Sequence, residues 1–127
     1  MTLKRSARTE AAPNFLHNLE AARLFFVDQD ADSAPTRFRK LKEELREMVT
    51  VVSWSPASGR PARFLGGRSA QSRLRAESVQ MLALQAGLPN LREYVLSRHI
   101  VLYAHSDTEV VFLALKHQRQ LMYSAEG

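Results

Sequence analysis

The sequence contains no cysteine and no long apolar run. Without cysteine the chain can form neither disulfides nor thiolate metal sites, so a reducing cytoplasm is the simpler expectation for its compartment. No apolar run approaches the roughly 20 residues that a membrane-spanning helix needs. Basic residues near the start are not followed by an apolar segment, which argues against a secretory signal. We therefore expect a cytoplasmic protein that does not span a membrane.

Acidic residues are fewer than basic ones. The chain holds 18 Lys and Arg against 13 Asp and Glu, a formal net charge of +5. A basic balance favours an anionic partner, such as nucleic acid, an acidic protein or a membrane surface, without choosing among them. Five arginines with no acid between them form either a solvated surface or a docking surface for an anionic partner: Arg60, Arg63, Arg68, Arg73 and Arg75.

The length of 127 residues predicts a single domain, 1–127, with a hydrophobic core of its own. After an arm or short edge strand at residues 1–12, apolar side chains at three- and four-residue spacing predict two helices over residues 13–52. A loop with two prolines and a glycine follows at residues 53–68, and a third, inserted helix at residues 69–86. Gly87 and Pro89 end that helix.

Three short apolar runs fill residues 91–116 and predict an antiparallel three-stranded meander. The first alternates as a half-buried strand, residues 100–103 are apolar on both faces like a central strand, and residues 110–115 form the third. Connections this short force antiparallel neighbours. A basic tail occupies residues 117–127. The expected fold class is α+β, with the helical hairpin packed on a small antiparallel sheet.

Several stretches in this order resemble one family, the RelE/ParE superfamily of bacterial type II toxin–antitoxin toxins, often labelled plasmid stabilisation proteins. The matching stretches are Ser55-Pro56-Ala57-Ser58-Gly59-Arg60-Pro61, Leu91-Arg92-Glu93-Tyr94-Val95-Leu96, Ile100-Val101-Leu102-Tyr103 and Val111-Phe112-Leu113-Ala114-Leu115-Lys116-His117-Gln118-Arg119-Gln120-Leu121. The resemblance covers residues 3–123 and departs from the family at the inserted helix. It implies a first strand near residues 3–8 beside the meander.

The resemblance also implies two kinds of partner: a cognate antitoxin that neutralises the toxin, and a macromolecular target. One branch of the family poisons DNA gyrase and another cleaves mRNA in the ribosome. The sheet lacks the dense cluster of Lys and Arg that marks the cleaving branch, which favours gyrase and leaves an mRNA endonuclease as the alternative. A basic nucleic-acid-binding module without toxicity is a third hypothesis. The chain is expected as a dimer or as a hetero-oligomer with the antitoxin.

Candidate site residues follow from the chemistry of RNA cleavage without metal, which needs an acid, a base and cations beside the phosphate. If the protein is a nuclease, the catalytic candidates are His117, Arg119 and Tyr123, with the Arg/Tyr placement resembling the tail of the cleaving branch. Arg92, Arg98 and Arg119 are candidates for binding the target or its phosphate. Each could instead be structural or face an antitoxin.

No metal or cofactor is expected. The histidines His99, His105 and His117 do not pair at close helical spacing, and nothing resembles a His-Glu-x-x-His arrangement. A serine hydrolase is unsupported, because the sequence has no Gly-x-Ser-x-Gly motif.

Overall fold

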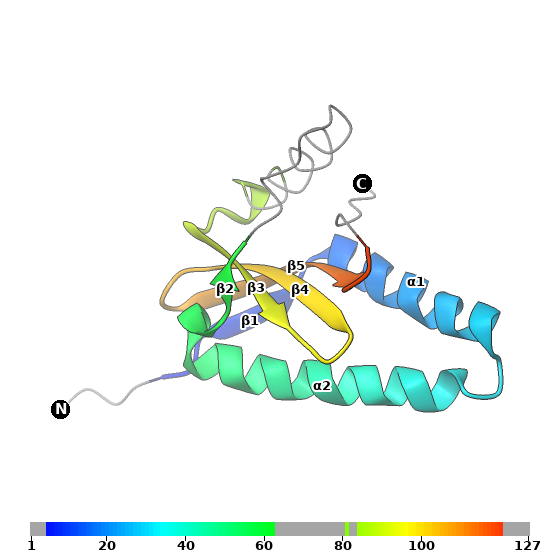
Figure 1. Ribbon diagram of the computed structural model, residues 1–127. Coiled ribbons are helices and arrows are strands. Elements are labelled where there is room, and N and C mark those ends of the chain that lie inside the picture. The colour runs from blue at the N-terminus through cyan, green and yellow to red at the C-terminus, as the bar shows by residue number, and fades with distance from the viewer. Residues whose placement is uncertain (1–4, 63–80, 82–83, 121–127) are drawn as a thin grey trace.

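The computed structural model describes residues 5–62, 81 and 84–120 of the chain. It is an α+β fold, as predicted, in which two helices pack against a five-stranded mixed sheet (Figure 1). In chain order the elements are β1 (Arg8–Ala11), α1 (Pro13–Gln29), α2 (Ala34–Trp54), the 3-10 turn η1 (Pro56–Ser58), β2 (Arg60–Pro61), β3 (Asn90–Val95), β4 (His99–His105) and β5 (Glu109–His117).

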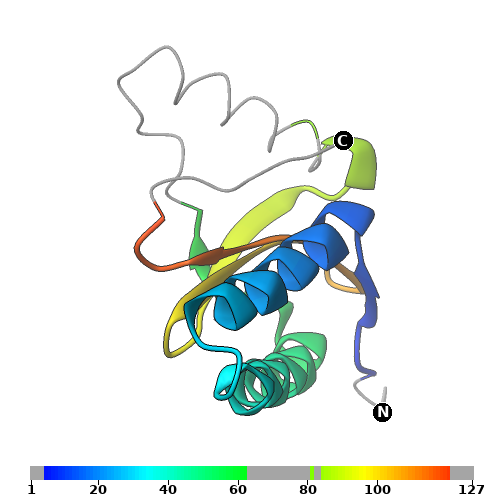
Figure 2. The same cartoon turned by 90° about the vertical axis from the view of Figure 1, so that its right-hand side faces the viewer.

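The predicted helical hairpin is confirmed, with α2 reaching two residues beyond the expected end at residue 52. Each helix begins with a proline in its first turn, where the missing N–H needs no partner. The apolar stripes of both helices belong to the main core. Figure 2 shows the two helices packed beside the sheet. The buried members are Phe15 and Phe26 from α1, and Leu41, Leu45, Met48 and Val52 from α2.

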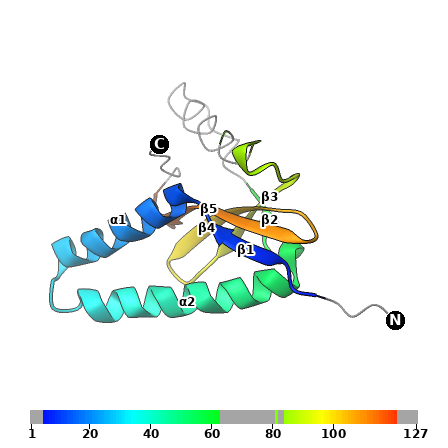
Figure 3. The same cartoon turned by 180° about the vertical axis from the view of Figure 1, so that it is seen from behind.

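The sheet order is β1-β5-β4-β3-β2. The three strands of the meander pair antiparallel, as predicted, and all of β4 is buried, as a central strand should be. The sheet as a whole is mixed, because β1 lies parallel to β5 (Figure 3). The first strand covers Arg8–Ala11, whereas residues 5–7, which are the described part of the expected range before Arg8, are not in a strand. Two helices connect β1 to the meander, and a connection of that length permits parallel pairing.

The two faces of the sheet are packed differently. Val101 and Tyr103 of β4 point into the main core beneath the helices, together with Phe112 of β5. Ile100, Leu102 and Ala104 point to the opposite face and form a second, smaller cluster. Ala62, Ala86, Leu88 and Leu91 pack against that second cluster. Segments on either side of residues 63–80 therefore contribute to the second face of the sheet.

A bulge interrupts β5. Leu102 pairs with Ala114 while Tyr103 pairs with Phe112, so Leu113 is the extra residue of β5. Beyond Phe112 the partner strand β1 has ended, and side chains of α1 take its place. Asn14 Nδ2 donates to the Leu113 carbonyl at 3.0 Å, and the Leu115 N–H donates to Asn18 Oδ1 at 3.0 Å. Helix α1 therefore closes the edge that β1 leaves open.

The loop before β2 is held on the sheet by the hydroxyl of Tyr103. This hydroxyl donates to the Pro56 carbonyl at 2.7 Å and accepts the Gly59 N–H at 2.9 Å. Gly59 is needed for this approach, because a Cβ there would lie 2.6 Å from the Glu93 carbonyl oxygen and 2.7 Å from the Tyr103 hydroxyl. Tyr103 thus fixes the path of the chain at residues 56–59.

Most of the inserted helix predicted for residues 69–86 lies outside the described residues. Met81 and residues 84–86 are helical, and Gly87 follows with a φ of 68°. A positive φ suits glycine because it has no Cβ. The predicted end of this helix at Gly87 is therefore confirmed.

We expect Tyr103→Phe to lower the free energy of unfolding by about 1–3 kcal/mol, because it leaves the Pro56 carbonyl and the Gly59 N–H without their partner. Urea denaturation followed by circular dichroism measures this change. Tyr94→Phe is the matched control, since Tyr94 only flanks the main core. Equal stability of the two variants would contradict a structural role for the Tyr103 hydroxyl.

Candidate functional site

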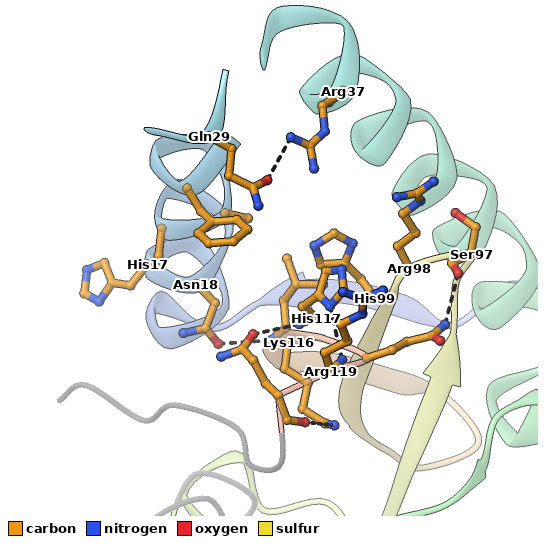
Figure 4. A pocket seen from close by; sticks show the side chains of 16 residues that line it. His17, Asn18, Gln29, Arg37, Ser97, Arg98, His99, Lys116, His117 and Arg119 are labelled. Carbon is orange, nitrogen blue, oxygen red and sulfur yellow. Dashed lines mark hydrogen bonds between the residues drawn. The ribbon is translucent and has the colours of Figure 1, made fainter. Parts of the chain in front are cut away.

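A pocket of about 870 Å³ lies where α1, the start of α2, the β3–β4 turn and the end of β5 meet (Figure 4). His17, Asn18 and Phe25 line it from α1, and Arg37 lines it from α2. The opposite wall comes from the β3–β4 turn and the last residues of the meander: Ser97, Arg98, His99, Leu115, Lys116, His117, Gln118, Arg119 and Gln120.

The Lys, Arg, Asp and Glu side chains of the lining are all of one sign. It holds four Lys or Arg side chains, which are Arg37, Arg98, Lys116 and Arg119, and no Asp or Glu. Arg37 donates to Gln29 Oε1 at 2.9 Å and lies 4.4 Å from the centre of the Phe26 ring. Among the described residues, the guanidinium groups of Arg98 and Arg119 form no ion pair with a carboxylate. As far as the described part of the chain extends, these two cations are therefore open to an anion from solution.

Hydrogen bonds tie the end of β5 to the β3–β4 turn. The Gln118 N–H donates to the Arg98 carbonyl at 2.9 Å, and Gln118 Nε2 donates to the carbonyls of Leu96 and Ser97 at 2.8 and 3.1 Å. The Gln120 N–H returns to the His117 carbonyl at 3.0 Å and closes a turn. Because Gln118 makes these contacts, Arg98 and Arg119 lie beside the same pocket although they belong to different segments.

Two histidines form the floor of the pocket. His99 and His117 are register partners on β4 and β5, and their ring centroids are 5.2 Å apart in an edge-to-face arrangement. His99 is only 6% exposed. Burial, followed by the charge of His117, lowers the pKa of His99 from 6.5 to about 4. Burial and the neighbouring arginines, Arg119 first among them, also lower the pKa of His117. Both rings are neutral at pH 7.

His117 is oriented as a hydrogen-bond donor. Its Nδ1 accepts the Arg119 N–H at 3.1 Å. A neutral imidazole that accepts at Nδ1 carries its proton on Nε2, so the second nitrogen can donate to an anion and cannot accept a proton in this tautomer. Together with the guanidinium groups, this donor suits a phosphate. The described lining holds no carboxylate that could act as a general base, and its other histidines are buried His99 and exposed His17.

The predicted site residues are only partly brought together. Arg98, His117 and Arg119 line one pocket. Arg92 pairs with Tyr103, four residues along β4 from His99, the partner of His117. That separation is about 13 Å along the strand. Arg92 Nε donates to His105 Nε2 at 3.0 Å and its Nη1 donates to the Gly59 carbonyl at 2.9 Å. Arg92 therefore does not line this pocket with Arg98 and Arg119, and its role in binding the target or a phosphate stays a prediction.

The predicted docking arginines fall mostly outside the described residues, as does Tyr123. These are Arg63, Arg68, Arg73 and Arg75. The fifth, Arg60, forms an ion pair with buried Glu93 at 3.3 Å. This pair secures the short strand β2 against β3, because Arg60 and Glu93 are register partners. Arg60 is thus occupied within the fold, which weighs against its prediction as a docking residue.

Sequence reasoning missed Arg37 and the role of His99. Arg37 lies next to Phe38 of the apolar stripe of α2, and only the fold shows that the start of α2 reaches the pocket. His99 directly precedes the apolar run at residues 100–103, so its position in a central strand could have indicated burial. The pairing of His99 with His117 depends on strand register, which the sequence leaves open.

No protein-family model matches the chain, and no curated protein is similar to it. Among the described residues, no three His, Cys, Asp or Glu side chains are grouped in a way that could hold a metal ion. In the same part of the chain, no helix has both the length and the apolar character that crossing a membrane requires.

Acid should destabilise the fold through His99. Because its pKa is about 4 in the folded protein and 6.5 normally, the unfolded chain binds the proton more tightly. The resulting stability is present above pH 6.5 and is lost as the pH falls toward 4, a change of about 2–3 kcal/mol. Urea denaturation at pH 7 and pH 4.5 should show a smaller acid loss for His99→Phe than for the wild type. The control variant His17→Gln should lose as much unfolding free energy between pH 7 and pH 4.5 as the wild type. If His99→Phe also loses as much as the wild type, His99 is not the group that makes the fold sensitive to acid.

If the pocket binds phosphate, Arg98→Glu should weaken binding of a short labelled oligonucleotide by roughly tenfold, because it replaces a cation of the lining with a repelling charge. The matched control is Arg39→Glu, the same charge change on an exposed residue outside the pocket lining. Fluorescence anisotropy measured over a range of salt concentrations checks both variants. Equal weakening by the two variants would mean that net charge, and not the pocket, determines binding.

Proposed function

We propose that this protein is the toxin of a type II toxin–antitoxin system of the RelE/ParE kind. The observation that carries the proposal is the position of β1. A first strand beside the meander is what the resemblance implies, and β1 pairs with β5 next to the helical hairpin. The loop with Ser55-Pro56-Ala57-Ser58-Gly59-Arg60-Pro61 then returns the chain to the sheet, anchored by Tyr103. The cytoplasm is the compartment in which such a toxin acts.

The toxin acts by binding its target, and DNA gyrase is the target that we propose first. Gyrase comes from the resemblance, whereas the preference for binding over cleavage comes from the pocket. Cleavage of RNA without metal needs a base for the 2′-hydroxyl. In the described pocket lining, His117 holds its acceptor nitrogen against the Arg119 N–H and no carboxylate can replace it. Arg92, a further cation that cleavage could have used, is held at the other end of the sheet.

An mRNA endonuclease is the second candidate, because one observation favours it. The end of β5 brings His117 and Arg119 into a pocket with Arg37 and Arg98, where several cations can surround one phosphate. Preorganised cations of this kind stabilise the charge that develops during phosphate-ester cleavage. In this candidate Tyr123, with His117 and Arg119, completes the catalytic group.

The cognate antitoxin is the proposed neutralising partner. A pocket lined by cations without acids attracts a segment of opposite charge, and the whole chain carries a net charge of +5. An acidic antitoxin segment that covered Arg98 and Arg119 would block the pocket directly. The resulting complex is a hetero-oligomer of toxin and antitoxin.

Induced expression in a bacterium should arrest growth, with loss of DNA supercoiling activity and intact transcripts. Supercoiling of a reporter plasmid and mRNA integrity are followed in the same culture. Codon-phased cuts in translated mRNA that vanish in His117→Ala and Tyr123→Phe would contradict gyrase as the target and support the mRNA endonuclease. Normal growth, with the protein present at full length, would contradict both and favour a basic nucleic-acid-binding module.

A further inference from the structure

The face of α1 that points away from the sheet carries an unusual set of side chains. Leu16 and Val27 are 53% and 41% exposed, although both are large and apolar. Between them lie Glu20 and Arg23, whose side chains form an ion pair at 2.6 Å while staying 54% and 42% exposed. Leu24, 52% exposed, flanks the row. Figure 3 shows that α1 lies at the outside of the molecule, with the sheet on one side of it only.

The spacing of this row is that of a coiled-coil seam. Residues 16, 20, 23 and 27 are separated by steps of four, three and four, which keeps them on one stripe of a helix. The stripe is distinct from the buried one, where Phe15 and Phe26 contact the core. It is also distinct from the side of α1 that lines the pocket with Asn18 and Phe25.

Two copies of this row that run in opposite directions are complementary in charge and in apolar character. If a second α1 lies antiparallel, with the two-fold axis passing between positions 21 and 22, Leu16 of one copy meets Val27 of the other. In the same register Glu20 meets Arg23 of the other copy. Two apolar layers then enclose two ion-pair layers, and every contact occurs twice by symmetry. The charged layers define the register, as polar residues do in coiled coils.

We propose that α1 is the contact surface of a symmetric dimer of this chain, with two copies of the helix packed antiparallel through Leu16, Glu20, Arg23 and Val27. Each Glu20 then binds an arginine of its own chain and one of the second copy. An interface built from one helix of each copy is smaller than the ~1,200–2,000 Å² that stable complexes bury. We therefore expect a dissociation constant in the micromolar range.

Charge-swap variants test this arrangement. Glu20→Arg and Arg23→Glu each place like charges opposite one another in a homodimer, so each variant alone should be monomeric at concentrations where the wild type dimerises. An equimolar mixture of the two variants restores both ion-pair layers and should form a heterodimer. Analytical ultracentrifugation of the full chain, made in a cell-free extract to avoid toxicity, measures all three samples, and circular dichroism checks their folding.

The mixture separates a contact between copies from a contact within one helix. Mixing cannot restore an ion pair that lies inside a single chain, so recovery of dimers appears only if Glu20 and Arg23 face each other across the interface. Glu47→Arg is the control, because it makes the same charge change on an exposed residue of α2. A wild type that stays monomeric up to about 1 mM overturns the proposal, and so does a mixture that behaves as the sum of its two monomers.

Discussion

The structure depends on the two hydrogen bonds by which α1 completes the edge of β5. Without Asn14 and Asn18, the Leu113 carbonyl and the Leu115 N–H of β5 would lose these partners on the side that β1 leaves. Buried backbone groups without partners cost free energy, so these bonds fix α1 along the strand. Because the same stretch of β5 leads to His117 and Arg119, the contacts that close the sheet also place α1 as a wall of the pocket.

The helices could be predicted from the sequence, because they follow from local periodicity. The pairing between strands far apart in the chain could not be predicted in full. The stripe that contains Leu41, Leu45 and Met48 indicated α2 directly, because its spacing needs no partner to be recognised. The parallel pairing of β1 could not be predicted from four residues of mixed character. The position of Arg92 away from Arg98 and Arg119 could not be predicted either, since only strand register shows that it lies opposite Tyr103 and reaches His105.

The arginines of the pocket differ from those elsewhere in the fold in whether an acceptor group of the protein lies beside them. Arg60 and Arg92 form contacts within the fold. Arg60 binds a carboxylate, and Arg92 donates to a ring nitrogen and to a backbone carbonyl. Arg98 and Arg119 lie on turns at the end of the sheet, where no acid neutralises them within the described residues. A fold that pairs some arginines and leaves others clustered concentrates its positive potential in one place.

Helix α1 therefore has three sides, and each side contributes to a different part of the molecule. One side, with Phe15 and Phe26, enters the core, and a second, with Asn18 and Phe25, lines the pocket. The third carries the row from Leu16 to Val27 and points away from both. Dimerisation through the third side leaves the pocket open, so two copies would present two basic pockets in a fixed relation. A partner with two anionic segments could bind both at once, and its apparent affinity would then exceed that of a single pocket.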